Sequence, residues 1–504
     1  MIDQRLASFT IFKMENGVKL ICPRILISCS RQRHNELQRS SFTMMNRVSG
    51  SIKRERFTLV VFTLKAGNQI IVSKRMIFFL LASILLLRSI SLSVQSAELS
   101  KPNVIVILAD DLGCCDLSMY NGWVETPRIE EMASQGMVFN DFHANSSVCS
   151  PTRTAFLTGR YQQRAGIVDV IVGNREPDSG ISPATVTLPR VFKNHGYATA
   201  IFGKWHCGYQ DQYSPIHHGF DEFVGFLNGA SDYHNHASWR IGLQPTNVPG
   251  YSTHIITDRS VDFIKRNQHN PFFLYVSHAA VHNPYQTAED TLGNRVKGDN
   301  PNQINEKNRA KYVRMLQDLD FGVGRILDTL HELQLANNTL VFFFSDNGAV
   351  GMSPAEFRHF RGGKFSQYEG GHRVPAIAWW PEKINAGSSS DKLIAGFDLF
   401  PTLTDIAGIS KFNPDNLDGL SFKSHLMHQA DFPERDLFFG YEPKLGTAMR
   451  RGHWKMIIKG DDVQLYNLHL DAQEMNNVVD QHPEVASSMR RAINTFKTEV
   501  TAGS

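Results

Sequence analysis

Three strongly apolar runs constrain the fold of this chain most, because polar side chains follow each of them closely. The runs and these polar residues are 104–108 with Asp110 and Asp111, 272–276 with His278 and His282, and 339–344 with Asp346 and Asn347. Runs rich in β-branched and aromatic residues are typical of strands buried on both faces of a parallel sheet. Ligands of such sheets bind beyond the carboxyl ends of the strands, so we expect the polar residues to meet at one site.

A long amphipathic helix is predicted between the second and third runs. Apolar residues recur there at steps of three and four from Tyr312 to Leu333, which is the spacing of a helix with one buried face. Buried strands that alternate with helices predict the α/β class, with a large, mostly parallel central sheet and helices on both faces. We expect this main domain to cover residues 98–430.

The pattern changes towards the C-terminus. Short strand-like runs at 436–439, 453–458 and 463–466 are followed by a helical pattern over about residues 483–498. Closely spaced short runs of this kind are typical of strands joined by tight turns. They predict a smaller α+β domain over residues 431–504, built on an antiparallel sheet and a terminal helix.

An apolar run at residues 76–87 follows Lys74 and Arg75 and precedes small and polar residues up to Ala97. It is shorter than the roughly 20 residues that span a bilayer and has the layout of a secretory signal. We predict a signal peptide over residues 76–97, a secreted or periplasmic location, and no stable membrane anchor. A short anchor and a core helix are the alternatives.

Charge separates the N-terminal segment from the rest of the chain. Residues 1–75 carry 14 Lys and Arg against 4 Asp and Glu, whereas residues 76–504 carry 38 against 45. Because a signal peptide lies close to the start of translation, we expect residues 1–75 to be a non-native N-terminal extension. The remaining chain is mildly acidic, which argues against a nucleic-acid partner.

Cys149 has the sequence surroundings of a helix N-terminus. Pro151 is favoured in the first turn of a helix and Ser150 is a good cap. Cys149 would then lie where free backbone N–H groups and the helix dipole attract an anion, with Arg153 one turn further on. From these residues alone, a cysteine beside an anion site and a buried structural cysteine remain open alternatives.

The chain resembles the sulfatase family, because several motifs of that family occur here in the family's order. The segment 149–160 contains Cys-x-Pro-x-Arg followed by Thr-Gly-Arg, the signature whose cysteine is oxidised to formylglycine. The other matching motifs are Asp110-Asp111, 196–206 with Gly203-Lys204-Trp205-His206, Val281-His282-Asn283-Pro284, Asp346-Asn347-Gly348, and Gly362-Gly363-Lys364 with Glu369-Gly370-Gly371. The resemblance runs from about residue 102 to residue 468. It is to enzymes of the arylsulfatase and N-acetylgalactosamine-6-sulfatase type, and it implies an alkaline-phosphatase-like fold.

The resemblance also implies a calcium ion and a set of catalytic groups. The implied metal ligands are Asp110, Asp111, Asp346, Asn347 and the modified Cys149, and oxygen ligands of this kind suit a hard cation. The implied catalytic residues are Cys149, Arg153, Lys204, His206, His282 and Lys364. The basic residues would hold the sulfate oxygens, and the two histidines would carry protons.

These residues predict an exported sulfuric ester hydrolase that acts on sulfated carbohydrates. The resemblance implies that formylglycine at position 149 is hydrated to a geminal diol, and that a maturation enzyme of the host oxidises Cys149. Two alternatives stay open: a phosphonate or phosphate ester hydrolase of the same superfamily, and an inactive protein that binds sulfated glycans.

Substrate contacts are predicted on a separate loop. Asp232, His234, Trp239 and Arg240 gather side chains that bind hydroxyl groups or stack on sugars, and binding loops often lie apart from the shared machinery. His278 is a further substrate candidate from the strand-end pattern. A solvated polar loop is the alternative interpretation of residues 232–240.

Overall fold

The computed structural model describes residues 101–173, 175–290, 303–410, 417–442 and 445–502, together with the backbone of six short strands before residue 71. The chain forms two compact units, Met1–Glu98 and Leu99–Ser504. In the first unit the strands form antiparallel pairs, which are β1 (Ile11–Lys13) with β2 (Lys19–Ile21), β3 (Arg39–Val48) with β4 (Ser51–Val60), and β5 (Lys65–Ala66) with β6 (Gln69–Ile70). The predicted signal peptide at 76–97 lies outside the described residues, as do the parts of the predicted extension between these strands.

A ten-stranded sheet is the centre of the second unit. In their order across the sheet, its strands are β13 (Gln244–Pro245), β12 (Trp239–Ile241), β11 (Glu222–Phe226), β10 (Ala198–Lys204), β14 (Phe272–Ser277), β7 (Asn103–Ala109), β15 (Thr339–Ser345), β16 (Ala376–Trp379), β8 (Met137–Phe139) and β17 (Ser388–Ser390). The five neighbours β11, β10, β14, β7 and β15 are all parallel. The three predicted buried strands are adjacent members of this block, as β14, β7 and β15.

The register aligns the ends of these strands. Leu108 of β7 lies opposite Ser277 of β14 and Phe344 of β15. Ser277 in turn lies opposite Gly203 of β10. The residues that follow these positions therefore leave the sheet at the same edge, as the strand pattern predicts.

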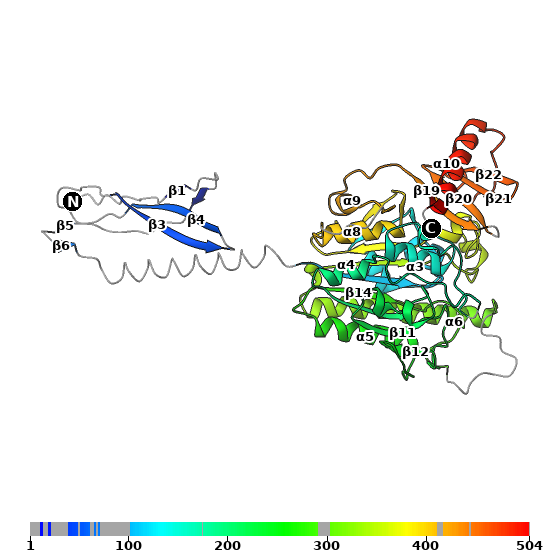
Figure 1. Cartoon of the computed structure of the whole chain (residues 1–504), viewed down its shortest axis with the longest axis horizontal. Coiled ribbons are helices and arrows are strands. Elements are labelled where there is room, and N and C mark those ends of the chain that lie inside the picture. Colours follow the sequence, from blue (N-terminus) through cyan, green and yellow to red (C-terminus); the bar gives the residue numbers. More distant parts are fainter. Residues whose placement is uncertain are drawn as a thin grey trace, which may run out of the picture. The chain divides into compact units, whose positions relative to one another are not determined.

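Helices cover both faces of the sheet (Figure 1). Each face carries its own apolar core, and the side chains along a strand point alternately into one core and the other. On β7, Ile105 and Ile107 belong to one core, and Val106 and Leu108 belong to the other. The first core includes residues of α2 (Pro127–Ser134), α5 (Ser252–Arg266) and α6 (Glu306–Glu332). The second includes residues of α3 (Cys149–Thr158), α4 (Leu188–Asn194), α8 (Leu399–Ile406) and α9 (Lys423–His428). The predicted α/β class with helices on both faces is confirmed.

The predicted long helix is α6, which begins before the apolar stripe does. The side chain of Asn305 caps its N-terminus by accepting a hydrogen bond of 2.9 Å from the backbone of Asn308. A cap of this kind satisfies a donor that the first turn leaves without a partner. None of the helices in the described part of the chain is long and apolar enough to cross a membrane.

A second, antiparallel sheet follows near the C-terminus, as predicted. Its strands are β19 (Asp436–Glu442), β20 (Gly446–Arg451), β21 (Trp454–Lys459) and β22 (Asp462–Asn467), and α10 (Pro483–Ala502) covers it. The strand β20 has no counterpart among the predicted runs, because its end carries Arg450 and Arg451 and shows no clear apolar alternation. This sheet belongs to the same compact unit as the central sheet.

The helix α3 lies between the two sheets. Phe156 and Leu157 on α3 belong to a core of the central sheet, whereas Ala155 packs with Leu437 and Phe439 of β19. All ten residues of this helix are buried. The position of its first residue, Cys149, therefore depends on packing against both sheets.

Candidate active site

Acidic residues at the ends of two neighbouring strands converge, as the strand pattern predicts. Asp110 follows β7 and Asp346 follows β15, and the backbone N–H of Asp346 donates to the carbonyl of Ala109 over 3.1 Å. Asp110, Asp111, Asp346 and Asn347 are all completely buried. The tertiary structure thus gathers three carboxylates and one amide in a space without water exposure.

Cys149 is the first residue of α3 and points at this acidic cluster. Its Sγ lies 3.8 Å from Oδ1 of Asp110. The predicted cap is wrong in one detail, because Val148 is the N-cap residue, while the Oγ of Ser150 accepts a hydrogen bond from the backbone of Ile171. The predicted location of Cys149 at a helix N-terminus is nevertheless correct.

The acidic cluster fits a hard divalent cation. Ligand atoms of Asp110, Asp111, Cys149 and Asp346 all lie within 4.8 Å of one another. Oδ2 of Asp111 and Oδ1 of Asn347 are buried and accept no hydrogen bond from the described residues. Burying such oxygens costs free energy unless a cation or a donor faces them. The five residues predicted as metal ligands are therefore brought together.

Three cationic side chains neutralise the carboxylates. Nζ of Lys204 lies 2.6 Å from Oδ2 of Asp110, and Nζ of Lys364 lies 2.6 Å from Oδ1 of Asp111. The guanidinium of Arg153 binds Oδ2 of Asp346 through Nε at 2.9 Å and Nη2 at 2.8 Å. Pairing of this kind is what permits several charges to be buried together.

The charges shift the pKa values of the acids in opposite directions. Burial and the neighbouring Asp110 raise the pKa of Asp346 to about 6, against the influence of Arg153. Burial alone would also raise the pKa of Asp111, but Lys364 and nearby basic groups hold it below its ordinary value. Asp111 is therefore ionised, and its backbone lies in the left-handed region with a φ of 64°, a strained state that concentrates at functional sites.

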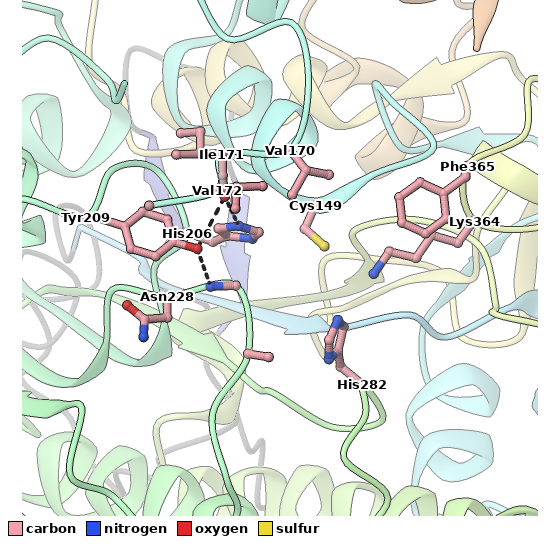
Figure 2. A pocket seen from close by; sticks show the side chains of 13 residues that line it. Cys149, Val170, Ile171, Val172, His206, Tyr209, Asn228, His282, Lys364 and Phe365 are labelled. Carbon is pink, nitrogen blue, oxygen red and sulfur yellow. Dashed lines mark hydrogen bonds between the residues drawn. The ribbon is translucent and has the colours of Figure 1, made fainter. Parts of the chain in front are cut away.

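A cavity of about 580 Å³ lies beside the acidic cluster and reaches Cys149. Figure 2 shows the sulfur of Cys149, the amine of Lys364 and the ring of His282 facing the same space. His206 lies on the opposite wall. The other lining residues are Val170, Ile171, Val172, Gly173, Tyr209, Asn228, Gly229, Ala230 and Phe365.

Arg153 and Lys204 lie behind this cavity, not on its wall. Besides Asp346, Arg153 binds the Oγ of Ser277 at 2.6 Å and the carbonyl of Lys204 at 3.1 Å. The sequence predicts that both basic residues hold sulfate. In the structure Arg153 pairs with Asp346 and Lys204 pairs with Asp110, and both residues are completely buried. Contact of either residue with sulfate stays a prediction.

His206 is held as a neutral base. Its Nε2 lies 3.1 Å from the carbonyl of Ile171, which can only accept, so Nε2 carries the proton and Nδ1 the lone pair. Nδ1 is buried without a hydrogen-bond partner among the described residues. Burial and the charge of Lys204 hold the pKa of His206 well below its ordinary value. A Cβ at Gly229 would lie 2.6 Å from this ring, so a larger residue there would displace the imidazole.

His282 and Lys364 differ in protonation. Nδ1 of His282 donates to the carbonyl of Asn283, and Nε2 lies 3.7 Å from Oδ2 of Asp111. Burial lowers the pKa of His282 to about 4, although Asp111 opposes this shift. Burial also disfavours the charged form of Lys364, but Asp111 outweighs it and raises the pKa of this lysine well above its ordinary value. Lys364 is therefore the protonated group on this wall.

The chain shares sequence with known sulfatases over most of its described length. A family model described as Sulfatase matches residues 102–409, and one described as the C-terminal part of N-sulphoglucosamine sulphohydrolase matches residues 356–499. This chain belongs to the sulfatase family. It is accordingly an enzyme that hydrolyses sulfate esters.

Individual sulfatases show the same relationship. This chain is 36% identical over 402 residues to N-acetylgalactosamine-6-sulfatase of Sus scrofa, and the match covers 74% of each chain. It is 32% identical over 405 residues to arylsulfatase G of Rattus norvegicus, covering 70% of this chain and 73% of the relative. The solved structure of Ps i-CgsB in complex with k-i-k-neocarrahexaose has 26% identity and a TM-score of 0.72, over 79% of this chain and 93% of that one.

An enzyme with another named activity shares the fold of this chain. The phosphonate monoester hydrolase of Agrobacterium radiobacter matches at 19% identity with a TM-score of 0.59, over 79% of this chain and 96% of that one. The predicted α/β architecture and sulfatase family are confirmed, whereas this last likeness concerns the fold only.

The residues predicted to contact substrate on the loop 232–240 do not line the cavity of this sulfatase. Trp239 is completely buried, packs against the tilted ring of His236 at 4.4 Å between ring centroids, and donates to the Oγ of Ser231. An indole inside the core cannot stack on a sugar, so the prediction for Trp239 is wrong. Arg240 binds Asp211 at 2.6 Å.

The remaining predicted substrate residues have structural partners too. Oδ1 of Asp232 accepts hydrogen bonds from the backbone of His234 and Asn235, and Nε2 of His234 lies 2.9 Å from the carbonyl of Thr287. His278 is completely buried, and burial lowers its pKa to about 3. None of the five predicted substrate residues lines the cavity of Cys149.

Sequence reasoning missed the actual walls of the cavity, namely residues 170–173, Tyr209, 228–230 and Phe365. One of these segments carries a detectable signal, because Asn228 and Gly229 follow the parallel strand β11. The strand-end rule that identifies Asp110 and Asp346 would have identified them as well. Residues 170–173 follow no strand, and we find no local pattern that marks them.

A second buried network joins the active site to the C-terminal sheet. Glu369 on α7 (Glu369–His372) accepts from Nη1 of Arg450 at 2.8 Å and from Nζ of Lys455 at 3.0 Å. The same network contains Asp141, His143, His372, Arg373 and Glu474. His143, Glu369 and His372 are close enough to hold a metal ion, but two basic side chains already bind this carboxylate, so the network holds the fold together.

This network supports the loop with Asp346 and Asn347 through α7. The backbone N–H of Gly348 donates to the carbonyl of Gly371 over 2.9 Å, and a Cβ at Gly348 would lie 1.8 Å from the carbonyl oxygen of Gly370. The loop with Asp346 and Asn347 thus rests directly on α7. The C-terminal sheet therefore contributes to the position of candidate metal ligands that it does not itself carry.

We predict that Glu369→Gln destabilises the sulfatase by about 3 to 5 kcal/mol at neutral pH, because it leaves Arg450 and Lys455 buried with less compensating charge. Burial opposes ionisation of Glu369, but Arg450 and Lys455 hold its pKa well below the ordinary value. The stabilisation is therefore present above the unfolded pKa, near 4.3, and is lost as the pH falls through the folded pKa.

Denaturant unfolding of the wild type and Glu369→Gln between about pH 7 and about pH 2.5 tests this prediction, because the loss begins only below the unfolded pKa. The difference in free energy of unfolding should be largest at the neutral end and shrink towards acid. Glu332→Gln changes an exposed residue of α6 and should remain within about 0.5 kcal/mol of the wild type. Equal stability of the two variants at neutral pH would contradict the role assigned to Glu369.

Proposed function

We propose that this sulfatase is an exported enzyme that removes sulfate from carbohydrate esters, with formylglycine at position 149 and one bound Ca²⁺. The observation that carries the proposal is the position of Cys149, which starts a buried helix, lies within 4.8 Å of three carboxylates, and lines the cavity. A carbohydrate substrate is supported by the names of relatives, an N-acetylgalactosamine-6-sulfatase and a protein solved in complex with a neocarrahexaose.

An unmodified thiol would be a poor nucleophile at this position. Burial raises the pKa of Cys149 to about 11, even though Lys204 and Lys364 oppose the shift. The reactive form of cysteine is the thiolate, which would be scarce near neutral pH. A hydrated aldehyde at position 149 would instead offer two hydroxyl groups, one to attack sulfur and one to assist the later release of sulfate.

The maturation enzyme would have to act before folding. Cys149 is only 2% exposed, and the whole of α3 is buried. An oxidising enzyme can reach this side chain in the unfolded chain far more easily than in the folded one. Burial therefore supports a partner that modifies Cys149 during or directly after synthesis.

Asp110, Asp111, Asp346 and Asn347 would hold the calcium ion together with the modified residue 149. Bound there, Ca²⁺ would compensate the three carboxylates and favour the ionised form of an attacking hydroxyl. Arg153 keeps Asp346 in place through the hydrogen bond from Nε and the ion pair of Nη2 with the same carboxylate oxygen. These side chains are fixed before substrate arrives, which reduces the reorganisation required during the reaction.

The two histidines would move protons on opposite sides of position 149. His206 is neutral and has a lone pair on Nδ1, so it can accept a proton from a hydroxyl group of the modified residue. His282 lies beside Lys364 and Asp111, where a negatively charged sulfate would raise its pKa towards the ordinary value. His282, with Lys364 beside it, would then donate a proton to the departing alcohol.

We expect active protein to contain formylglycine at position 149. Peptide mass spectrometry should find residue 149 changed by the exchange of H₂S for one oxygen atom. Cys149→Ser should still bind a sulfate ester but lower kcat by about 10³-fold or more, because a serine lacks the second hydroxyl group. Cys115→Ser changes a partly exposed cysteine outside the cavity and serves as the control. Full activity with an intact Cys149 thiol would refute this mechanism.

We expect one Ca²⁺ per chain in purified active enzyme, and a lower melting temperature after chelation. A ligand at about 1,000 times its Kd stabilises the folded state by about 4 kcal/mol. Asn347→Ala removes one oxygen ligand and should reduce metal content, activity and the calcium-dependent rise in melting temperature together. Asn385→Ala changes an exposed asparagine as control. An active enzyme without any divalent ion would contradict the site.

Export predicts that the mature chain begins close to residue 98, because the apolar run at 76–87 ends in small and polar residues up to Ala97. N-terminal sequencing of protein recovered outside the cytoplasm checks this. Recovery of exported material that retains residues 76–97 would overturn the proposed signal peptide.

Parallel assays with an aryl sulfate and the matching phosphate and phosphonate esters test the reaction class, and we expect the sulfate to be hydrolysed fastest.

A further inference from the structure

A second hollow of about 680 Å³ adjoins the cavity of Cys149. Lys364 and Phe365 line both spaces and form the wall between them. Arg358 and Arg361 also line the second hollow, and none of the described residues that line it is acidic. This space, called the arginine pocket below, is therefore a positively charged surface next to the position of the sulfate ester.

The two arginines are held by neutral groups, so their charge remains available. Arg358 donates to the carbonyl of Ser353 at 2.9 Å through Nε and to that of Gly351 at 3.0 Å through Nη2. Arg361 donates to the carbonyl of Glu474 at 2.6 Å and stacks over the ring of Tyr368 at 4.0 Å. A guanidinium oriented in this way loses little freedom when it binds a carboxylate or a sulfate.

Phe365 supplies an apolar platform between the two spaces. Its side chain is 55% exposed, which is unusual for a large aromatic residue, and its backbone lies in the left-handed region with a φ of 68°. The backbone N–H of Phe365 donates to the carbonyl of Ser147 over 3.1 Å, which ties the platform to the segment before Cys149. Strained residues of this kind persist where the surrounding structure holds them, often at ligand sites.

We propose that the arginine pocket binds the neighbouring sugar residue of an oligosaccharide substrate and selects a residue that carries its own anionic group, a carboxylate or a second sulfate. The sulfated sugar would lie in the cavity of Cys149, with the chain crossing the ring of Phe365. Arg358 and Arg361 would bind the second anion. This inference rests on the proposed carbohydrate substrate and gives the sulfatase a specificity surface in place of the loop 232–240.

The test compares kcat/KM for three kinds of substrate: 4-nitrophenyl sulfate, a sulfated disaccharide with a neutral neighbouring sugar, and the same disaccharide with a carboxylate or a second sulfate on that neighbour. In the wild type, the anionic disaccharides should be preferred over the neutral one. Arg358→Gln and Arg361→Gln should each lower this preference about tenfold, which corresponds to about 1.4 kcal/mol, through a higher KM with little change in kcat.

Two further variants separate the contributions of charge and of the ring. Phe365→Ala should lower kcat/KM for both disaccharides more than for 4-nitrophenyl sulfate. Arg490→Gln removes the same charge from an exposed position on α10, outside both spaces, and should leave the preference unchanged. Raising the ionic strength should weaken the preference in the wild type, because exposed charges are screened by salt. If Arg358→Gln loses the preference for only one of the two anionic disaccharides, the anionic group of that disaccharide is the one that the arginine pocket recognises.

Equal losses on all three kinds of substrate in Arg358→Gln and Arg361→Gln, or an unchanged preference, would overturn the proposal. Arg358→Lys keeps the charge and should keep most of the preference, so it remains informative if either glutamine variant fails to fold. A wild type that hydrolyses 4-nitrophenyl sulfate but shows no preference for a second anion overturns the arginine pocket alone. A wild type that hydrolyses no sulfate ester instead overturns the proposed function.

Discussion

The pairing of buried carboxylates with basic side chains is the interaction on which the rest of this active site depends. Asp110, Asp111 and Asp346 are brought together by the ends of two parallel strands, where their charges repel one another. Lys204, Lys364 and Arg153 compensate these charges at distances of 2.6 to 2.9 Å. Each basic residue comes from a different part of the chain, so the site forms only when the sheet, α3 and the loop before α7 are in place.

The C-terminal sheet extends this dependence beyond the main domain. It packs on α3, which carries Cys149, and its residues Arg450 and Lys455 bind Glu369 next to the loop that holds Asn347. Cys149 and the loop with Asp346 and Asn347 are thus both supported by contacts of this sheet. The smaller sheet therefore helps to set the geometry of the site in this chain.

Sequence patterns predicted the structure best where the hydrophobic spacing of a segment matches the way in which that segment packs in the fold. Three apolar runs predicted adjacent strands, and the spacing from Tyr312 to Leu333 predicted most of α6. The predictions failed where the neighbouring structure overrides local chemistry. Val148, not Ser150, occupies the N-cap position of α3, and the Oγ of Ser150 instead accepts a hydrogen bond from the backbone of Ile171. Trp239 belongs to the core although its loop is rich in polar residues.

The sequence by itself determined the α/β class, the family, and the residues that gather around position 149, because these depend on side-chain periodicity and on motifs of adjacent residues. Only the tertiary structure decided that Arg153 and Lys204 hold carboxylates behind the cavity, and that two arginines line a second hollow separated from the cavity of Cys149 by Phe365. Contacts between residues far apart in the chain depend on how strands, helices and loops pack. Local spacing carries no information about which of those surfaces come to face one another.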